Sequence, residues 1–367
     1  MKVLHYVRSL SPVHGGPSRS VPNLAAELAR SGVAVALCSS SSDVVSAEAL
    51  RAAAAGVRLL HTPRTRGTSF RDEVSGTDVV HLHGLWTPSV HRVSAIAAGL
   101  GKPIVHSCRG MLEPWALRHK RARKRLAWNL YQRRDLRRAS RIHATSAMEA
   151  SHLAALGFDR QVVVIPNGTE IPTPPTAERP DLRQILFLSR LQKKKGLDLL
   201  GAAAHELRED LQRGGWSIVV AGPEEDDSLA SLRHYLEEHR LTHLFSIRPP
   251  VDGSEKWDLL SNASLFVLPT HSENFGLVIA ESLAAATPVI TTTATPWQEI
   301  GAAGCGWWVD PDVTALTAAL REATALSHRQ RLDMGRRGRE LVTSRYSWPA
   351  VAKRFGTLYE TLVTERA

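Results

Sequence analysis

The sequence predicts an α/β protein with two domains, each built on a parallel sheet. At 367 residues the chain is long for a single hydrophobic core. Runs of apolar, β-branched residues alternate with helical patterns in both halves, and a proline-rich stretch separates the halves. We therefore expect a first domain at residues 1–170, a linker at 171–181, a second domain at 182–345 and a final helical segment at 346–367.

The first half contains six runs with the composition of buried strands. They are Lys2–Val7, Val33–Leu37, a run from Asp78 that ends in a turn by Trp86, Pro103–Ser107, Ile142–Ser146 and Val162–Ile165. Gly15 and Gly16 lie between the first strand and a helix that Gly32 ends. A diglycine turn lets the backbone come close to a ligand, but it equally fits a tight turn, so both interpretations stay open.

Two histidines stand at the end of the third of these runs. Because side chains alternate along a strand, His81 and His83 lie on the same face. His83 is expected at the carboxyl edge of the sheet, where ligands bind, whereas His81 is expected in the core with a hydrogen-bond partner. Two histidines at this spacing could bind a metal, but no third ligand follows at a convincing spacing.

Positive charge concentrates in one segment of the first half. Between Arg118 and Arg141 there are eleven Lys or Arg residues and a single acid, Asp135, with apolar residues interleaved. The pattern predicts one basic amphipathic helix, suited to an anionic membrane surface or a phosphate-bearing acceptor. A solvated helix face is the alternative. Nucleic acid is less favoured, because the aromatic residues that would stack on bases are sparse. The net charge of +10 fits an anionic partner without choosing among them.

The second half repeats the β/α alternation. Its expected strands are Ile185–Leu188, Ile218–Val220, Phe245–Ile247, Leu265–Leu268 and Val289–Thr292. A basic loop with Arg190 and Lys195 follows the first of them, and Gly196 opens the next helix. Two cations in the crevice beyond a parallel sheet can neutralise a diphosphate leaving group, a role that a metal ion plays in other folds. The alternative is an ordinary basic surface turn.

Two glutamates flank a predicted helix start in the same half. Glu273 belongs to the loop after the strand Leu265–Leu268, and Glu281 lies within the following helix. Backbone N–H groups at the start of that helix favour an anion, typically a phosphate. They belong to Asn274, Phe275, Gly276 and Leu277. Carboxylates beside such a site suit sugar hydroxyls, so the chemistry points to a phosphorylated sugar, with a helix charge and a solvated surface residue as the alternative.

Several other classes of protein find no support. The sequence has no Gly-x-Gly-x-x-Gly, no Gly-x-x-x-x-Gly-Lys-Ser/Thr and no Gly-x-Ser-x-Gly, which argues against dehydrogenases, nucleoside triphosphatases and serine hydrolases. Asp310 and Asp312 look like the cap of a helix near Val313, and the acidic run 224–227 looks like a loop. We therefore expect no metal site.

Cysteine usage and hydropathy suggest a cytoplasmic protein. Cys38, Cys108 and Cys305 are widely spaced and expected to be buried thiols. No apolar run approaches the roughly 18 residues of a membrane span. A strand begins almost at Met1, so we expect no signal peptide.

Together these motifs make the chain resemble the retaining glycosyltransferases of family 4. The resemblance rests on Glu273 and Glu281 as a Glu-x7-Glu pattern, the loop 190–196, the strand ending in His83 and the pair Gly15-Gly16, which occur in the family's order. It covers essentially the whole chain. It implies the GT-B architecture, with two Rossmann-like domains facing across a cleft, and a C-terminal helix that crosses back to the first domain.

The resemblance also implies roles for individual residues. Arg190 and Lys195 would hold the donor diphosphate, helped by the Gly16 backbone and by the helix start at 274–277. Glu281 would accept hydrogen bonds from the ribose hydroxyls of the nucleotide. The nucleoside diphosphate sugar is then a substrate, and neither a metal nor another cofactor is required.

Catalytic and acceptor residues follow less directly. Glu273 and His83 would lie near the transferred sugar, and the leaving diphosphate would itself take the acceptor proton. The candidates for contacting the acceptor or the membrane are Arg109, Trp115, Arg118, Lys120, Arg121 and Lys124. The runs 83–86, 109–112 and 305–309 resemble a branch associated with bacterial cell-surface polysaccharides.

The leading hypothesis is therefore an enzyme that moves a hexose from a nucleoside diphosphate sugar to a polyprenyl-linked or oligosaccharide acceptor at the anionic inner face of the membrane. A second hypothesis is a GT-B enzyme that acts on a soluble acceptor or a free sugar nucleotide. A third is a non-catalytic protein that binds polyanions or a membrane surface through the basic segment. No nucleic acid partner is expected.

Overall fold

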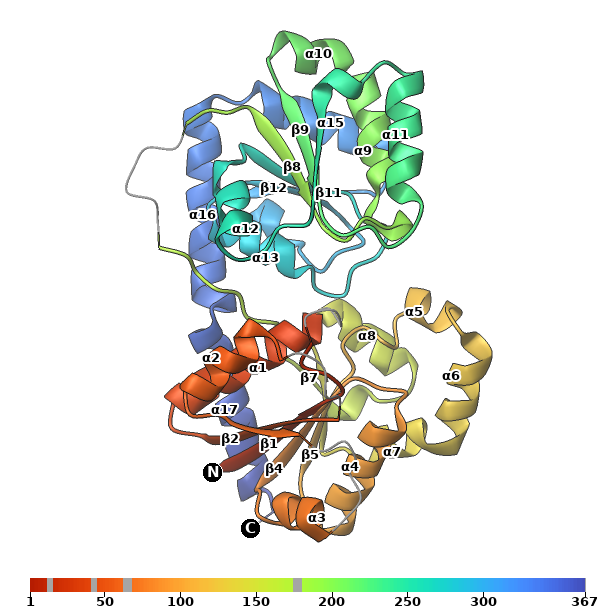
Figure 1. Cartoon of the computed structure of the whole chain (residues 1–367), viewed down its shortest axis with the longest axis vertical. Coiled ribbons are helices and arrows are strands. Elements are labelled where there is room, and N and C mark those ends of the chain that lie inside the picture. The colour runs from red at the N-terminus through yellow and green to blue at the C-terminus, as the bar shows by residue number, and fades with distance from the viewer. Residues whose placement is uncertain (12–15, 41–44, 62–67, 174–179, 367) are drawn as a thin grey trace. The chain divides into compact units, whose positions relative to one another are not determined.

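The computed structural model describes residues 1–11, 16–40, 45–61, 68–173 and 180–366 (Figure 1). The chain divides into two compact units. Unit 1 comprises Met1–Gly168 and Trp348–Ala367, and unit 2 comprises Thr169–Ser347. Gly15 and the middle of the expected linker lie outside the described residues.

Unit 1 is built on a seven-stranded parallel sheet with the order β3-β2-β1-β4-β5-β6-β7. The strands are β1 Lys2–Val7, β2 Ala34–Ser39, β3 Arg58–His61, β4 Val79–His83, β5 Ile104–Ser107, β6 Arg141–Ala144 and β7 Val162–Val164. Six of them were predicted, because strands covered on both faces form continuous apolar runs. β3 was missed. It is an edge strand whose terminal residues, Arg58 and His61, are exposed, so it lacks that pattern.

Helices cover both faces of this sheet. They are α1 Gly16–Arg30, α2 Ala47–Ala54, α3 Thr68–Ser75, α4 Pro88–Gly99, α5 Pro114–Arg118, α6 Arg121–Ala127, α7 Arg133–Arg138, α8 Ala147–Ala155 and α17 Trp348–Thr364. One core cluster joins α1, α2 and α17 to the sheet, and a second joins α3, α4, α7 and α8 to it. The C-terminal helix α17 thus buries Val351, Phe355 and Tyr359 within unit 1, although it follows unit 2 in the chain.

The prediction of a single basic helix from Arg118 to Arg141 is wrong. α5 ends at Arg118, Lys120 adopts left-handed backbone (φ 52°), and α6 begins only at Arg121. A π turn at Trp128–Gln132 then joins α6 to α7, and Arg141 already belongs to β6. The charge pattern alone could not reveal this, because neither a left-handed lysine nor a π turn has a compositional signature.

Unit 2 is built on a six-stranded sheet with the order β10-β9-β8-β11-β12-β13. The strands are β8 Gln184–Leu188, β9 Ser217–Ala221, β10 Phe245–Arg248, β11 Leu265–Leu268, β12 Val289–Thr292 and β13 Gly306–Val309. The helices are α9 Leu197–Glu206, α10 Arg208–Arg213, α11 Ser228–Glu238, α12 Gly253–Asn262, α13 Leu277–Ala284, α14 Glu299–Ala302, α15 Val313–Ala325 and α16 His328–Tyr346. β13 was not predicted, because its sequence is half-buried and aromatic.

Smaller predictions can be checked against the same structure. Asp312 caps α15 by accepting a hydrogen bond from Ala315 N at 2.8 Å, as predicted from the Asp310-Pro311-Asp312 turn. All three cysteines are buried and free, which is also confirmed. Among the described helices, none is both long and apolar enough to cross a membrane.

Both sheets are all-parallel, and in each the strand order reverses between two central strands. The reversal lies between β1 and β4 in unit 1 and between β8 and β11 in unit 2. Such a topological switch point leaves a crevice beyond the carboxyl ends of the strands, where ligands bind in open α/β sheets.

Candidate active site

The loops that follow β8 and β11 are locked together at the switch point of unit 2. Gly196 has φ +76°, and a Cβ atom there would lie 2.0 Å from the Pro269 carbonyl oxygen, so no side chain fits. The Thr270 hydroxyl and the His271 N–H both donate to the Lys194 carbonyl at 2.8 Å. Lys194 and Gly196 are therefore both held against the loop that follows β11. Lys195, which lies between these two residues, is fixed in position.

Lys195 forms an ion pair with Glu273 across these two loops. The side chains are only 6% and 14% exposed, respectively. Burial opposes ionisation of Glu273, but the positive charges of Lys195 and Lys194 outweigh it and lower the pKa of this carboxyl. The carboxylate also accepts a hydrogen bond from Asn274 N at 3.2 Å. The carboxyl group of Glu273 is thus ionised, and Lys195 contacts the loop that carries it.

Glu273 leads into α13, which begins at Leu277, so Asn274 and Phe275 precede the helix and were wrongly expected in its first turn. Gly276 is the N-cap, with φ +78°, and a Cβ there would meet Ile279 at 2.8 Å and the Glu273 side chain at 3.2 Å. Phe275 is buried against Trp297, whose indole N–H donates to the Phe275 carbonyl. The Phe275 ring thus supports the turn from within the core, and its contribution to an anion site would be its backbone N–H.

Glu281 lies within α13 and has a partner that sequence reasoning missed. The Lys256 ammonium of α12 donates to Glu281 Oε1 at 2.8 Å and lies 5.2 Å from the centre of the Trp257 ring. Nothing in the sequence marks Lys256, since a lone lysine in a helix is unremarkable. The structure nevertheless makes it the cation next to the carboxylate expected to bind ribose.

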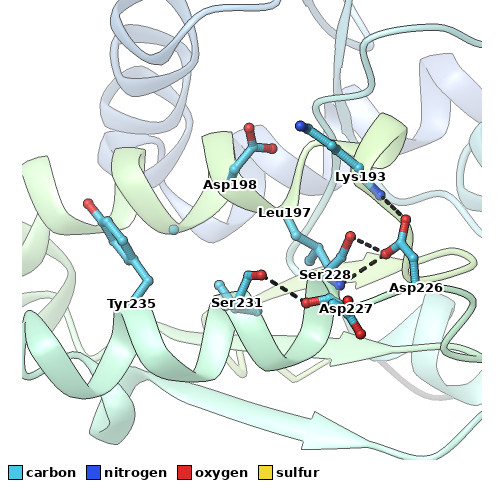
Figure 2. A pocket seen from close by; sticks show the side chains of 10 residues that line it. Lys193, Leu197, Asp198, Asp226, Asp227, Ser228, Ser231 and Tyr235 are labelled. Atoms are coloured by element: carbon cyan, nitrogen blue, oxygen red, sulfur yellow. Dashed lines mark hydrogen bonds between the residues drawn. The ribbon is translucent and has the colours of Figure 1, made fainter.

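Arg190 pairs with Glu225 rather than with the Lys195–Glu273 pair. Its guanidinium lies 2.9 and 3.1 Å from the two carboxylate oxygens, and both side chains are well exposed. The acidic run 224–227 therefore lies alongside the basic loop, which its sequence did not indicate. Within it, Asp226 accepts hydrogen bonds from Lys193 N and Ser228 N (Figure 2).

A pocket of about 500 Å³ opens between α9 and α11 beside this acidic run (Figure 2). None of the predicted site residues lines it. The Asp226 carboxylate points toward Lys193 and Ser228 and accepts hydrogen bonds from both (Figure 2). The Ser231 hydroxyl donates to the Asp227 carbonyl (Figure 2). We assign this pocket no function.

In unit 1, His83 stands at the carboxyl end of β4, as predicted, but its side chain is buried and both ring nitrogens are used. Arg109 Nη2 donates to Nδ1 of His83 at 3.1 Å. Because a guanidinium only donates, Nδ1 is unprotonated and the neutral ring carries its proton on Nε2. That proton is donated to Nδ1 of His5 at 3.0 Å. The Nε2–H of His5 is then a buried donor without a partner among the described residues.

A second chain of hydrogen bonds fixes His81. Nε2 of His143 donates to the Ile165 carbonyl at 2.7 Å, so its Nδ1 accepts from the Ser107 hydroxyl at 2.6 Å. Ser107 Oγ accepts from His81 Nε2 at 2.7 Å, and His81 Nδ1 accepts from the Tyr359 hydroxyl at 2.6 Å. The prediction that His81 is a hydrogen-bonded core residue is confirmed.

The electrostatics keep these rings neutral. Burial, with a contribution from the Arg109 charge, lowers the pKa of His5 and of His143 to about 3, and burial lowers the pKa of His106 to about 4. Burial lowers the pKa of His81 and His83 well below the usual value as well. Burial lowers the pKa of Arg109 only to about 10, so it is the cation of this cluster at neutral pH.

His5, His81 and His83 bring three ring nitrogens within 4.8 Å of one another. Their lone pairs, however, already accept hydrogen bonds from His83, Tyr359 and Arg109, respectively. A neighbouring guanidinium also disfavours a cation. The donor set thus fits a hydrogen-bonded network better than a metal centre. That the chain needs no metal stays a prediction.

The remaining predicted residues are dispersed over unit 1. Gly16 is the first residue of α1. Arg109 is tied to Asn167 and to the histidines. Trp115, Arg118, Lys120 and Arg121 are exposed. Lys124 is half-buried, donates to the Ala116 carbonyl and lies 5.8 Å from the centre of the Trp86 ring. The functional roles proposed for these residues stay predictions.

Comparison with known proteins agrees with this organisation. A family model described as Glycosyltransferase Family 4 matches residues 14–171, and one described as Glycosyl transferases group 1 matches residues 173–341. The GDP-mannose:cellobiosyl-diphosphopolyprenol alpha-mannosyltransferase of Komagataeibacter xylinus is 27% identical over 394 residues, covering 99% of this chain and 94% of the relative. The D-inositol 3-phosphate glycosyltransferase of Kineococcus radiotolerans is 30% identical over 323 residues, covering 79% and 73%, respectively.

Among solved structures, Anabaena HepE in complex with UDP is similar to this chain with a TM-score of 0.77. The similarity covers 98% of this chain and 100% of that chain at 16% identity, and at that identity it concerns the fold. Fold, motif order and family models agree. The chain therefore belongs to glycosyltransferase family 4 and is a glycosyltransferase with the GT-B fold of two Rossmann-like domains.

Proposed function

We propose that the protein transfers a hexose from a nucleoside diphosphate sugar to a lipid-linked or polysaccharide acceptor, with retention of the anomeric configuration. One observation carries the donor half of this proposal. A largely buried ion pair between Lys195 and Glu273 lies beside the N-terminus of α13, at the switch point of the sheet of unit 2. Cations and unpaired backbone donors then converge where a diphosphate would bind.

The ion pairs of unit 2 can rearrange around such a donor. An ammonium has three donors, so Lys195 can keep Glu273 and still donate to a phosphate oxygen. The Arg190–Glu225 pair is exposed, and exposed ion pairs contribute little, so the guanidinium can turn to the diphosphate at small cost. Glu281, to which Lys256 donates a hydrogen bond, would accept hydrogen bonds from the ribose hydroxyls.

Retention needs no protein nucleophile in this proposal. The bond between the anomeric carbon and the diphosphate oxygen breaks, and the electron pair leaves with the nucleoside diphosphate. The acceptor oxygen bonds to the same carbon from the same face, and its proton passes to the departing diphosphate. Lys195 and Arg190 stabilise the charge that develops there, which would make a metal ion unnecessary.

A lipid-linked acceptor is supported by the surface of the basic segment. The segment contains two large exposed apolar residues, Leu126 and Leu130, with 62% and 63% exposure, and Trp115, with 46% exposure, lies just before it. Exposed apolar groups among lysines and arginines suit an anionic bilayer surface. The relative from Komagataeibacter carries a diphosphopolyprenol acceptor in its name. We therefore place this enzyme peripherally on the inner face of the bacterial membrane, in surface glycan synthesis.

The decisive experiment is a screen of nucleotide sugars for slow hydrolysis, which needs no acceptor. The proposal expects one donor to be hydrolysed and the anomeric configuration of the released sugar, followed by NMR, to be retained. Hydrolysis with inversion would refute the retaining mechanism. Calorimetry with UDP and GDP tests the non-catalytic alternative, because a polyanion-binding scaffold has no need to bind either nucleotide.

A sedimentation assay separates the two enzymatic hypotheses. Vesicles of phosphatidylglycerol and phosphatidylethanolamine should carry the protein into the pellet at low salt and release it as salt is raised. Absence of binding would remove the membrane from the proposal and leave transfer to a soluble acceptor.

A further inference from the structure

Unit 1 contains a pocket of about 640 Å³ that the donor site does not account for. It lies at the carboxyl ends of β1 and β4, where Val7 and His83 are paired neighbours in the sheet. Its walls are the loops that follow these two strands and one face of α6. The pocket is therefore at the switch point of the sheet of unit 1.

The pocket concentrates positive charge. Four cations line it, Arg8, Lys120, Arg123 and Lys124, and no acidic side chain is among the described residues of its lining. Arg8, Lys120 and Arg123 form no ion pair with any residue that the structure describes. Burial and the charge of Lys120 lower the pKa of Lys124. Like charges held this close are relieved by an anion.

The local fold explains how three of these cations come to line one wall. Arg123, Lys124 and Ala127 share one face of α6, and Lys120 is the capping residue directly before the helix. The left-handed backbone of Lys120 separates α6 from α5. Arg125, by contrast, lies on the same helix, is exposed and is not part of the lining.

The π turn holds the backbone of another lining residue, Trp86. Trp86 has φ +68°, an uncommon conformation for a residue with a bulky side chain. Gln132 Oε1 accepts from its N–H at 2.8 Å, and the Tyr131 hydroxyl donates to its carbonyl at 2.9 Å. These two clamps are consecutive residues of the π turn, and such turns occur frequently at functional sites.

We propose that this pocket binds the diphosphate of a lipid-linked acceptor, with Lys120 and Arg123 as its principal ligands and the Trp86 indole as a wall against the attached group. Arg8 and Lys124 add charge. The exposed Leu126 and Leu130, in the same helical segment, provide an apolar surface for the start of the hydrocarbon chain. The inference rests on the proposed function, because it specifies how that enzyme holds its acceptor.

The test is calorimetric binding of geranyl diphosphate, a water-soluble isoprenyl diphosphate, to the full chain. Arg123→Gln should weaken binding at least about tenfold, since a hydrogen bond to a charged group is lost. Arg125→Gln removes the same charge two positions away and should change affinity less than about twofold. Equal affinity of wild type and Arg123→Gln, or equal loss in both variants, would overturn the proposal. Both residues are exposed, so neither change threatens folding.

Competition identifies the source of the diphosphate. GDP and UDP should not displace geranyl diphosphate, and displacement would mean that the pocket serves the donor instead. Vesicles of phosphatidylglycerol should bind Arg123→Gln and Arg125→Gln equally, because attraction to a charged surface depends on charge more than on position. A larger loss for Arg123→Gln would assign the pocket to a lipid headgroup and overturn the proposal.

A donor-site variant keeps this inference distinct from the proposed function. Lys195→Ala should impair nucleotide binding while geranyl diphosphate binds as in wild type. If no nucleotide sugar is ever hydrolysed yet geranyl diphosphate binds through Arg123, the proposed function fails and the pocket stands. If hydrolysis occurs but Arg123→Gln binds geranyl diphosphate normally, the pocket assignment fails alone.

Discussion

The switch points of the two units use opposite electrostatic designs. In unit 2 the cations already have carboxylate partners, in the pairs Lys195–Glu273, Lys256–Glu281 and Arg190–Glu225. In unit 1 a half-buried Arg109 lies among neutral histidines, and the cations of the basic pocket lack acidic partners among the described residues. Paired charges can exchange a carboxylate for a phosphate without a change in protonation. Neutral rings in fixed tautomers cannot change partners without moving protons.

This contrast suggests a division of labour. Unit 2 is suited to bind and release a dianionic leaving group in every catalytic cycle, since its ion pairs close again when the anion departs. Unit 1 is suited to present a rigid surface, because the hydrogen bonds of the histidine network fix which ring nitrogen carries each proton. Variants that remove one member of a pair should therefore have different consequences in the two units.

The largest effect is expected at Lys195. Lys195→Ala should reduce transfer by about 10²–10³-fold, because it removes a cation aimed at the departing diphosphate. It also leaves Glu273 buried without its partner, so the free energy of unfolding should fall, by about 3–5 kcal/mol if the site does not relax. Steady-state kinetics and urea unfolding measure the two losses.

A double variant separates these two losses. Lys195→Met combined with Glu273→Gln removes both charges and should recover most of the stability but none of the activity. Near-normal turnover in Lys195→Ala would contradict the site assignment.

Acid should destabilise unit 1 before unit 2. The folded pKa values of His5 and His143 are about 3, far below the usual 6.5, so the unfolded chain binds more protons than the folded one as pH falls. Their contribution is complete above pH 6.5 and declines below it by about 1.4 kcal/mol per histidine per pH unit, until the pH reaches the folded value. Glu273 has a lowered pKa, so its contribution is lost only below about pH 4.5.

Urea unfolding between pH 7.5 and 5 checks this difference. The free energy of unfolding should fall with decreasing pH more steeply than one histidine alone would cause. His143→Gln should make this dependence on pH less steep. A flat profile over this range would contradict the neutral network.

Much of the fold and of the donor site could be predicted from the sequence. The rest could not, for a physical reason. The strands next to each switch point are buried on both faces, so their apolar runs predicted β4, β8 and β11. Gly196 and Gly276 marked the starts of α9 and α13, because each must adopt positive φ. Glu273 and Lys195 were found because they flank those glycines.

The partners of the site residues could not be found this way. Glu225, Lys256 and Tyr359 reach the predicted residues from 35, 25 and 278 positions away, respectively. Their residue types are ordinary at such positions, so only the fold reveals what they contact. The π turn is a similar case. Its Tyr131 and Gln132 became informative once both were seen to hold Trp86.

An intermediate effect is expected where α17 enters the histidine network. Tyr359→Phe removes only the hydroxyl that donates to His81 and leaves Nδ1 of that ring buried without a donor. The free energy of unfolding should fall by about 1–3 kcal/mol. Tyr235→Phe, on α11 of unit 2, is the matched control, because no described residue forms a hydrogen bond with its hydroxyl. Equal stability of the two variants in urea would show that the network contributes nothing.

The smallest effect is expected at the Arg190–Glu225 ion pair. It tests most directly whether a cation of unit 2 can exchange its carboxylate partner for a phosphate. Glu225→Gln removes the exposed carboxylate that holds Arg190, so the free energy of unfolding should change by roughly 0–1 kcal/mol. Nucleotide affinity should rise about two- to fivefold, because Arg190 no longer has to leave an ion pair to reach a diphosphate. Glu209→Gln, an exposed acid on α10, is the control for the general change in charge. If Glu225→Gln weakened UDP or GDP binding in calorimetry, Glu225 would be holding Arg190 in its working position, and the exchange that we infer for unit 2 would not occur there.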